Sequence, residues 1–293
     1  MQTPLEENPM SSSDPSELDD EIDYRRVHRS QHPQGSVVRF GSTPFGDGGF
    51  TVIAGPCAVE SADQIDETAR IVAEHGGRVL RGGAFKPRTS PYSFQGLGLE
   101  GVRMMRRAAD NHGLPLVTEV MAPTAVEEMA DLVDAFQIGA RNMQNFDLLK
   151  AIGASGVPAM LKRGFGTTLR EWLLAAEYIL AEGNDQVILC ERGIRTFDEA
   201  TRFTLDLAGA LWAQRETHLP VIIDPSHATG KPGLIPSLVQ AAVAAGLDGA
   251  MVEAHPEPES ARSDGDQALD PEQFAELMQR LERVAGAVGR PLV

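Results

Sequence analysis

The sequence predicts a (β/α)8 TIM barrel, an α/β fold, from three observations. Eight short apolar runs recur along the chain, and segments with helical spacing lie between them. The runs lack polar alternation, as expected for parallel strands that are covered on both faces. Seven of them end at a residue able to bind a metal ion, a phosphate or a carboxylate. Barrel enzymes carry their active sites at this carboxyl end of the strands.

The segment ahead of the barrel divides into a tail and a hairpin. Residues 1–23 are rich in Pro, Ser, Asp and Glu, and they bury too little apolar surface to offset the entropy of ordering. We expect residues 1–36 to be a disordered or loosely attached tail without a regulatory domain, and residues 37–293 to form the catalytic barrel. Residues 37–40 and 50–53 flank a turn-rich stretch and predict an opening hairpin.

The predicted strands follow in order, each separated from the next by a helical segment. They span residues 51–55, 78–82, 115–120, 136–140, 157–162, 187–192, 220–224 and 249–254. This count favours a closed barrel over an open doubly wound sheet. No GxGxxG follows the first strand, which weakens the dinucleotide-binding alternative.

Three of the intervening helices begin with recognisable capping signals. Residues 61–64 (SADQ) and 168–171 (TLRE) have the capping-box pattern. Residues 270–273 (DPEQ) supply an N-cap, a proline at the first helical position and a glutamine two residues later. Apolar residues at helical spacing follow each signal, which predicts an amphipathic helix in each place.

Charge and composition exclude several classes of protein. The formal net charge is −16, with 42 acidic and 26 basic residues, which argues against a nucleic-acid or cationic membrane-surface binder. The two cysteines provide no disulfide framework. No apolar run approaches the roughly 20 residues that span a bilayer, and the N-terminus does not resemble a secretory signal. We therefore expect a cytoplasmic protein.

Four side chains at or after strand ends could bind one divalent metal ion: Cys57, His227, Glu253 and Asp264. The mixture of sulfur, nitrogen and oxygen suits Zn, Fe, Mn or Co better than Mg or Ca. The alternative is that Cys57 is a packed small residue and His227 a structural histidine. A Gly-Pro turn before Cys57 favours exposure of its thiol at the rim, whereas Cys190 lies inside an apolar run and is expected to be packed.

A second signal comes from cationic residues that lie at or just past strand ends. They are Arg81, Lys86, Arg88, Arg141, Lys162 and Arg192. Solvated surface charge would explain any one of them. Together on one face they predict a pocket for multiply charged anions, because guanidinium groups bind phosphate and carboxylate bidentately. The hydroxyls of Thr89 and Ser90 also suit a phosphate, and GFGTT at 164–168 is either another anion site or a plain turn and helix cap.

Several motifs in order resemble class I 3-deoxy-D-arabino-heptulosonate 7-phosphate (DAHP) synthases of the beta subgroup. They are AGPCAVES, RGGAFKPRTSPYSFQG, QIGARNMQN, LKRGFGTT, ILCERGIRTF, DPSHATG and VEAHPEPESARSDGDQAL. The resemblance covers roughly residues 37–290. It implies a metal-dependent condensation of phosphoenolpyruvate with erythrose 4-phosphate that releases phosphate and opens the shikimate pathway to aromatic amino acids.

The resemblance also assigns roles to residues of this chain. The family's metal ligands fall on Cys57, His227, Glu253 and Asp264. Its phosphoenolpyruvate-binding residues fall on Arg81, Lys86, Arg141, Lys162 and Arg192. The KPRT segment places Arg88 and Thr89 at the aldose phosphate, and Asp224 would contact the aldose or a metal-bound water. As a mechanistic hypothesis separate from the resemblance, we expect Lys86 or a metal-bound water to transfer the proton. Family analogy also suggests a homotetramer or homodimer.

Two other functions compete with this one. The sister family, 3-deoxy-D-manno-octulosonate 8-phosphate synthase, uses arabinose 5-phosphate and typically carries an Asn-containing KANRS-type loop. This chain has KPRTS at 86–90, and the proline would hold Arg88 in a different place, which favours the shorter sugar. A non-catalytic phosphometabolite sensor is the other alternative, but a sensor has no need of the metal ligands.

Overall fold

Within the described residues of the computed structural model (23–86, 92 and 94–293), eight parallel strands close into a barrel, as predicted. They are β3 (Thr51–Gly55), β4 (Val79–Gly82), β5 (Leu116–Glu119), β6 (Ala135–Ile138), β7 (Ala159–Lys162), β8 (Val187–Glu191), β9 (Val221–Ile223) and β10 (Gly249–Glu253). The strands pair in chain order, and β10 closes the ring against β3 with Gly249 opposite Thr51. The strand ends therefore meet at one mouth.

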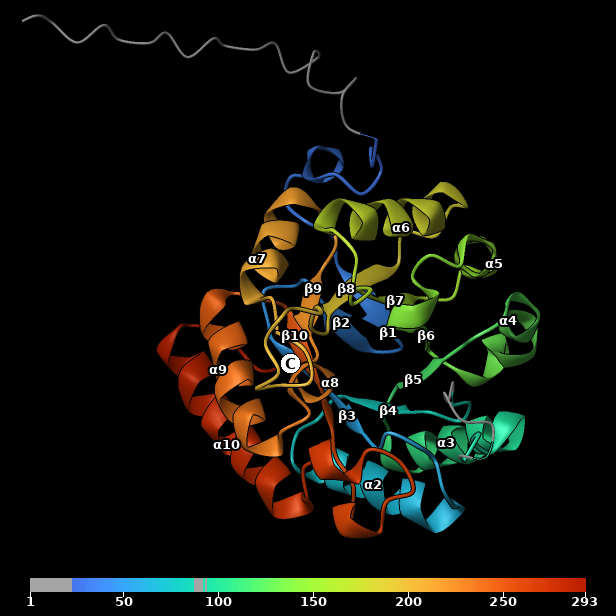
Figure 1. Cartoon of the computed structure of the whole chain (residues 1–293), viewed down its shortest axis with the longest axis vertical. Helices are drawn as coiled ribbons and strands as arrows, with labels where there is room; N and C mark the ends of the chain where they lie inside the picture. The colour runs from blue at the N-terminus through green and yellow to red at the C-terminus, as the bar shows by residue number, and fades with distance from the viewer. Residues whose placement is uncertain (1–22, 87–91, 93) are drawn as a thin grey trace, which may run out of the picture.

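Helices form a ring around the barrel (Figure 1). The longer ones are α2 (Ala62–Glu74), α3 (Gly98–His112), α4 (Pro123–Met129), α5 (Phe146–Ser155), α6 (Leu169–Ala181), α7 (Leu207–Glu216), α9 (Ile235–Ala245) and α10 (Pro271–Ala287). The short α8 (Pro225–Thr229) follows β9 directly. Single 3₁₀ turns lie at Arg29–Gln31, Ala130–Leu132, Ala140–Asn142, Pro232–Leu234, Pro258–Ser260 and Gly265–Gln267.

The capping signals act largely as predicted. Thr168 begins α6 and Asp270 begins α10, each with a reciprocal capping box. Ser61 begins α2 and accepts a hydrogen bond from the backbone N–H of Gln64. The Gln64 side chain accepts from the backbone N–H of Glu60 instead of from that of Ser61, so this third cap is not reciprocal.

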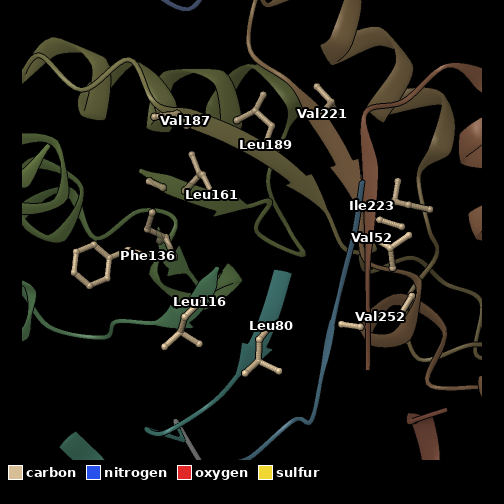
Figure 2. Close-up of a cluster of buried hydrophobic side chains, with 14 of the residues drawn as sticks. Val52, Leu80, Leu116, Phe136, Leu161, Val187, Leu189, Val221, Ile223 and Val252 are labelled. Carbon is tan, nitrogen blue, oxygen red and sulfur yellow. The ribbon is translucent and has the colours of Figure 1, made fainter. Parts of the chain in front are cut away.

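Alternate residues of the strands fall into two apolar clusters. One points outward and packs against the helices; it includes Leu80, Leu116 and Phe136, which Figure 2 shows with side chains from the other barrel strands. The other fills the barrel interior and includes Ile53, Met160 and Cys190. Because both faces of each strand are buried, the sequence carries apolar runs without alternation.

A two-stranded hairpin closes the amino end of the barrel. It consists of β1 (Val38–Phe40) and β2 (Thr43–Phe45), and Phe40 and Phe45 join the interior cluster. Thr43 Oγ1 donates to the carbonyl of Arg78, just before β4, and Thr51 Oγ1 donates to the carbonyl of Pro44. The prediction of a hairpin was right, but its second arm is β2, and the predicted arm at 50–53 belongs to the barrel. A short apolar arm around a proline gives little sequence signal.

Residues 23–36 form an arm that packs against α6 and α7 (Figure 1). Val27 is fully buried, its N–H donates to Glu177 Oε2 at 2.9 Å, and its carbonyl accepts from Thr217 Oγ1 at 2.6 Å. Tyr24 Oη donates to Glu216 Oε1 at 3.0 Å. This packing differs from the loose attachment expected for the segment, because two apolar side chains and several backbone bonds fix it.

No helix among the described residues is long and apolar enough to cross a membrane.

Candidate metal centre and anion pocket

The turn after β3 brings Cys57 to the mouth of the barrel. Gly55 has φ +151°, and a Cβ there would lie 2.0 Å from the carbonyl oxygen of Arg81, so only glycine permits this close approach of β3 and β4. Arg81 Nη1 donates to the carbonyl of Pro56 at 2.8 Å. The Cys57 side chain is therefore held beside the end of β4.

Three residues from different strand ends place metal-binding atoms together. One atom each of Cys57, His227 and Glu253 lie within 4.8 Å of one another. Glu253 ends β10, and His227 lies on α8, whose N-cap Asp224 accepts from the backbone N–H of His227 at 3.1 Å. Asp264 lies beside this group, with Oδ2 3.0 Å from Cys57 Sγ.

Asp264 is also the one non-glycine residue with positive φ in the described part of the chain, at 53°. Left-handed backbone is uncommon for a residue with a side chain, and such strain gathers at functional sites. In this conformation its carboxylate lies beside Cys57.

Buried charges connect this cluster. His227 Nδ1 lies 2.7 Å from Asp224 Oδ2, and His227 Nε2 lies 3.1 Å from Glu253 Oε1. Burial disfavours the imidazolium, but the two carboxylates outweigh that effect and raise the pKa of His227 to about 9. Burial likewise opposes ionisation of Glu253 and Asp224, yet His227 and the neighbouring cations Arg81 and Lys162 hold the pKa of each carboxyl below its usual range.

The chemistry of this donor set fits a divalent metal ion. A thiol, an imidazole and two carboxylates match the borderline-soft ions Mn, Fe, Zn or Co. Asp224 stands behind His227 as the carboxylate that commonly orients a metal-binding imidazole. Two carboxylates face His227, and a metal ion bound to its imidazole would supply positive charge between them.

Two of the predicted cations are paired with carboxylates. Arg81 Nη1 lies 3.1 Å from Glu253 Oε1, and Lys162 Nζ lies 2.6 Å from Asp224 Oδ2. Both cations are buried. They therefore lie at the mouth and hold the two carboxylates that face His227.

The other described cations have different partners. Lys86 Nζ lies 2.9 Å from Cys57 Sγ and donates to the carbonyl of Cys57 at 2.6 Å. Arg192 is buried and donates to the carbonyl of His227 at 3.3 Å. Arg141 is exposed and shares the ring of Phe165 with Arg192. Arg88 and Thr89 lie outside the described residues.

Several residues that contact the metal-binding cluster were not predicted from the sequence. Gln267 Nε2 donates to Glu253 Oε2 at 2.6 Å, and Arg202 Nη1 donates to Gln267 Oε1 at 2.9 Å. Ser263 Oγ lies 3.4 Å from Cys57 Sγ. Ser263 and Gln267 follow β10 in the same stretch as Asp264. This closeness to a predicted ligand was the one sequence feature that could have pointed to them. Neutral polar residues in a loop give no pattern that distinguishes them from ordinary surface residues.

Comparisons with known proteins show the family of this chain. The sequence model of the DAHP synthetase I family matches residues 37–287. A phospho-2-dehydro-3-deoxyheptonate aldolase of Thermotoga maritima is 51% identical over 266 residues, covering 91% of this chain and 79% of the relative. A crystal structure of a DAHP synthase from Thermotoga maritima superposes with a TM-score of 0.88 at 50% identity, covering 91% of this chain and 78% of that one.

A second group of relatives is more distant. A 2-dehydro-3-deoxyphosphooctonate aldolase of Hydrogenovibrio crunogenus is 30% identical over 257 residues, which is 82% of this chain and 92% of the relative. The lower identity agrees with the sequence-based preference for the first group.

Proposed function

Because the chain belongs to the DAHP synthetase I family, we propose that the cluster at the mouth of its barrel is the active site. The enzyme is a transferase that condenses phosphoenolpyruvate with erythrose 4-phosphate. The products are 3-deoxy-D-arabino-heptulosonate 7-phosphate and phosphate, and the reaction is the first step of the shikimate pathway.

One observation carries the assignment of the site: the group of Cys57, His227 and Glu253 lies beside several cations. Cys57, His227, Glu253 and Asp264 would hold a divalent metal ion, which when bound supplies a Lewis acid for the aldehyde oxygen of the sugar. Which of Mn, Fe, Zn or Co serves here stays part of the proposal.

The cations bind and orient the first substrate. Phosphoenolpyruvate carries a phosphate and a carboxylate, and Arg81, Lys86, Arg141, Lys162 and Arg192 supply its binding groups. Guanidinium forks match both anions bidentately. Holding both substrates at reacting distance converts a bimolecular step into an effectively unimolecular one.

The bond changes balance with one water molecule. C3 of phosphoenolpyruvate forms a bond to the aldehyde carbon of erythrose 4-phosphate, water adds at C2, and the C–O bond to phosphate breaks. Lys86 is the proposed proton-transfer group, because its Nζ lies at the mouth against Cys57. Asp224, held by Lys162 and His227, is the proposed contact of the sugar or of the water. Arg88 and Thr89 are proposed to bind the aldose phosphate.

The assay that tests this function measures phosphate release from phosphoenolpyruvate by the purified chain. After chelation and reloading with Mn²⁺, we expect release with erythrose 4-phosphate, little with arabinose 5-phosphate and none without a sugar. Faster release with the five-carbon sugar would move the chain to the sister function. Absence of release with either sugar under each candidate metal would contradict the proposed site.

Two further proposals concern the whole chain. Residues 37–293 are proposed as the catalytic barrel, and the protein is proposed to assemble as a homotetramer or homodimer. Light scattering of the purified protein measures the assembly, and a strictly monomeric mass would contradict that proposal.

A further inference from the structure

Two phenylalanine rings stack at the barrel mouth. Phe165 lies in the loop after β7 and Phe203 in the segment after β8, and their rings are 5.5 Å apart with an interplanar angle of 19°. Both side chains are partly buried. The stack therefore joins the loop after β7, a strand that ends at the proposed substrate-binding residue Lys162, to the segment after β8, which begins with Arg192.

Four guanidinium groups surround this stack. Arg192 lies 4.4 Å from the centre of the Phe203 ring and 5.8 Å from that of Phe165. The others are Arg141 at 5.9 Å and Arg195 at 5.3 Å from Phe165, and Arg202 at 6.0 Å from Phe203. These distances are in the range, about 6 Å or less, in which a ring face attracts a cation.

The cations at the mouth differ in the groups that they contact. Arg81, Lys162 and Arg163 each lie within 3.1 Å of a carboxylate oxygen. Among the described residues, Arg141 and Arg192 form no ion pair, and the hydrogen bonds of Arg192 go to two backbone carbonyls.

This difference matters for anion binding. A carboxylate partner neutralises a guanidinium and occupies its N–H donors, so it competes with a substrate anion. A ring face attracts the same cation through its π electrons and leaves the edge of the guanidinium available. Burial lowers the pKa of Arg192, and the more distant carboxylates of Asp224 and Glu191 act in the opposite direction.

The backbone around the rings fixes their position. Phe203 N–H donates to the carbonyl of Ala228 at 2.7 Å, and Arg195 N–H donates to the carbonyl of Phe165 at 2.7 Å. Gly193 has φ +91°, and a Cβ there would lie 2.7 Å from Phe203 Cβ. Phe203 is thus seated against α8, which carries His227.

We propose that Phe165 and Phe203 are positioning residues for phosphoenolpyruvate, which hold Arg192 and Arg141 in place without neutralising them. This inference rests on the proposed role of these two arginines. It adds a second way of fixing the proposed substrate-binding cations: carboxylates hold Arg81 and Lys162, and aromatic rings hold Arg192 and Arg141.

The test uses full-length metal-loaded enzyme and the variants Phe165→Leu and Phe203→Leu, which keep apolar bulk and remove the ring. We expect each to raise KM for phosphoenolpyruvate about tenfold, the size of a partly desolvated cation–π contact. KM for erythrose 4-phosphate and the midpoint of thermal unfolding should stay near wild type. Calorimetric titration with phosphoenolpyruvate alone should show the same loss of affinity.

Two further replacements separate charge from packing. Phe203→Tyr keeps an attractive ring face and should restore affinity. Pentafluorophenylalanine introduced at position 203 keeps the shape and reverses the ring's electrostatics, so it should weaken binding as leucine does. Phe146→Leu is the matched control: Phe146 stacks on Tyr178 at 4.6 Å with Lys150 nearby, on the outer helices, and it should change neither KM.

The outcomes distinguish this inference from the site assignment. If Arg192→Gln weakens phosphoenolpyruvate binding but both leucine variants bind normally, the positioning role is wrong and the site stands. Equal losses for both substrates, or equal behaviour of the tyrosine and pentafluoro replacements, would also overturn it, because either result indicates packing alone. If Arg192→Gln binds phosphoenolpyruvate normally, the proposed role of that arginine itself fails.

Discussion

Glu191 is a buried carboxyl group at the end of β8. Its Oε1 accepts from the backbone N–H of Gly193 at 2.8 Å, and its Oε2 accepts from that of Asp206 at 3.3 Å. Burial is the main effect on this group and raises its pKa to about 7, although the two N–H donors and Arg163 act in the opposite direction.

Glu191→Gln should therefore change how stability depends on pH. The unfolded chain loses the Glu191 proton near its ordinary pKa, whereas the folded chain keeps it until about pH 7. Wild type should lose stability relative to the variant as pH rises from 5 to 8, by up to about 3 kcal/mol at roughly 1.4 kcal/mol per pKa unit. Urea unfolding of both proteins at each pH measures this, and a difference that does not vary with pH would contradict it.

Gln267 provides a second prediction for a single residue. Its amide holds Glu253 Oε2 at 2.6 Å, and Gln267→Met keeps the length of the side chain without the donor. We expect metal affinity to fall about tenfold to a hundredfold, the usual cost of removing a group that orients a ligand. Competition with a chromogenic chelator measures the affinity, and an unchanged dissociation constant would show that Gln267 does not orient Glu253.

The positions of some site residues could be predicted from the sequence, whereas those of others could not. Cys57, His227 and Glu253 were predictable because each follows a strand, and the barrel topology brings strand ends together. Gln267, Phe165 and Phe203 were not, because their roles depend on which side chain lies across the mouth. A loop sequence does not encode that contact in any local pattern.

Helix α10 begins at a capping box formed by Asp270 and Gln273. Asp270→Ala removes the acceptor for a backbone N–H at 2.8 Å and should lower the free energy of unfolding by about 1 kcal/mol. Glu272→Ala in the same turn is the matched control, because Glu272 is exposed and provides no cap. Equal effects of the two changes in urea unfolding would contradict the role of the cap.

Elements were predicted with unequal success. The barrel strands follow from continuous apolar runs, and α6 and α10 follow from capping residues that act locally. The second arm of the hairpin failed because β2 is only Thr43–Phe45, with a proline in the middle. The burial of β2 depends on the barrel interior that packs against it. The local spacing of apolar residues does not reveal that contact.

Residues that stabilise the fold and residues proposed for catalysis lie at opposite ends of the barrel. The β1–β2 hairpin closes the amino end, and the charged cluster occupies the carboxyl end. Phe40 is fully buried in the interior cluster. Phe40→Ala should lower the free energy of unfolding by about 3–5 kcal/mol and leave metal affinity unchanged below the unfolding transition. A parallel loss of metal affinity in the folded variant would contradict this separation.

The overall charge is also divided. In a chain of net charge −16, the buried guanidinium group of Arg192 lies over two aromatic rings at the mouth. The net charge of −16 predicts that nucleic acid is not a partner, whereas the local cations are proposed to attract small anions. Composition alone indicated the first property, but the second required the strand ends to be placed in space.

We propose that Cys57 supplies a thiolate to the metal ion, and the absorption spectrum of the cobalt(II)-loaded protein provides the decisive test. Thiolate coordination to Co²⁺ gives an intense charge-transfer band in the near ultraviolet. We expect that band in wild type and in Cys190→Ser, since Cys190 is buried inside the barrel, and we expect its loss in Cys57→Ser. A band that persists in Cys57→Ser, or its absence from wild type with one equivalent of Co²⁺ bound, would show that Cys57 is not a thiolate ligand of the metal ion.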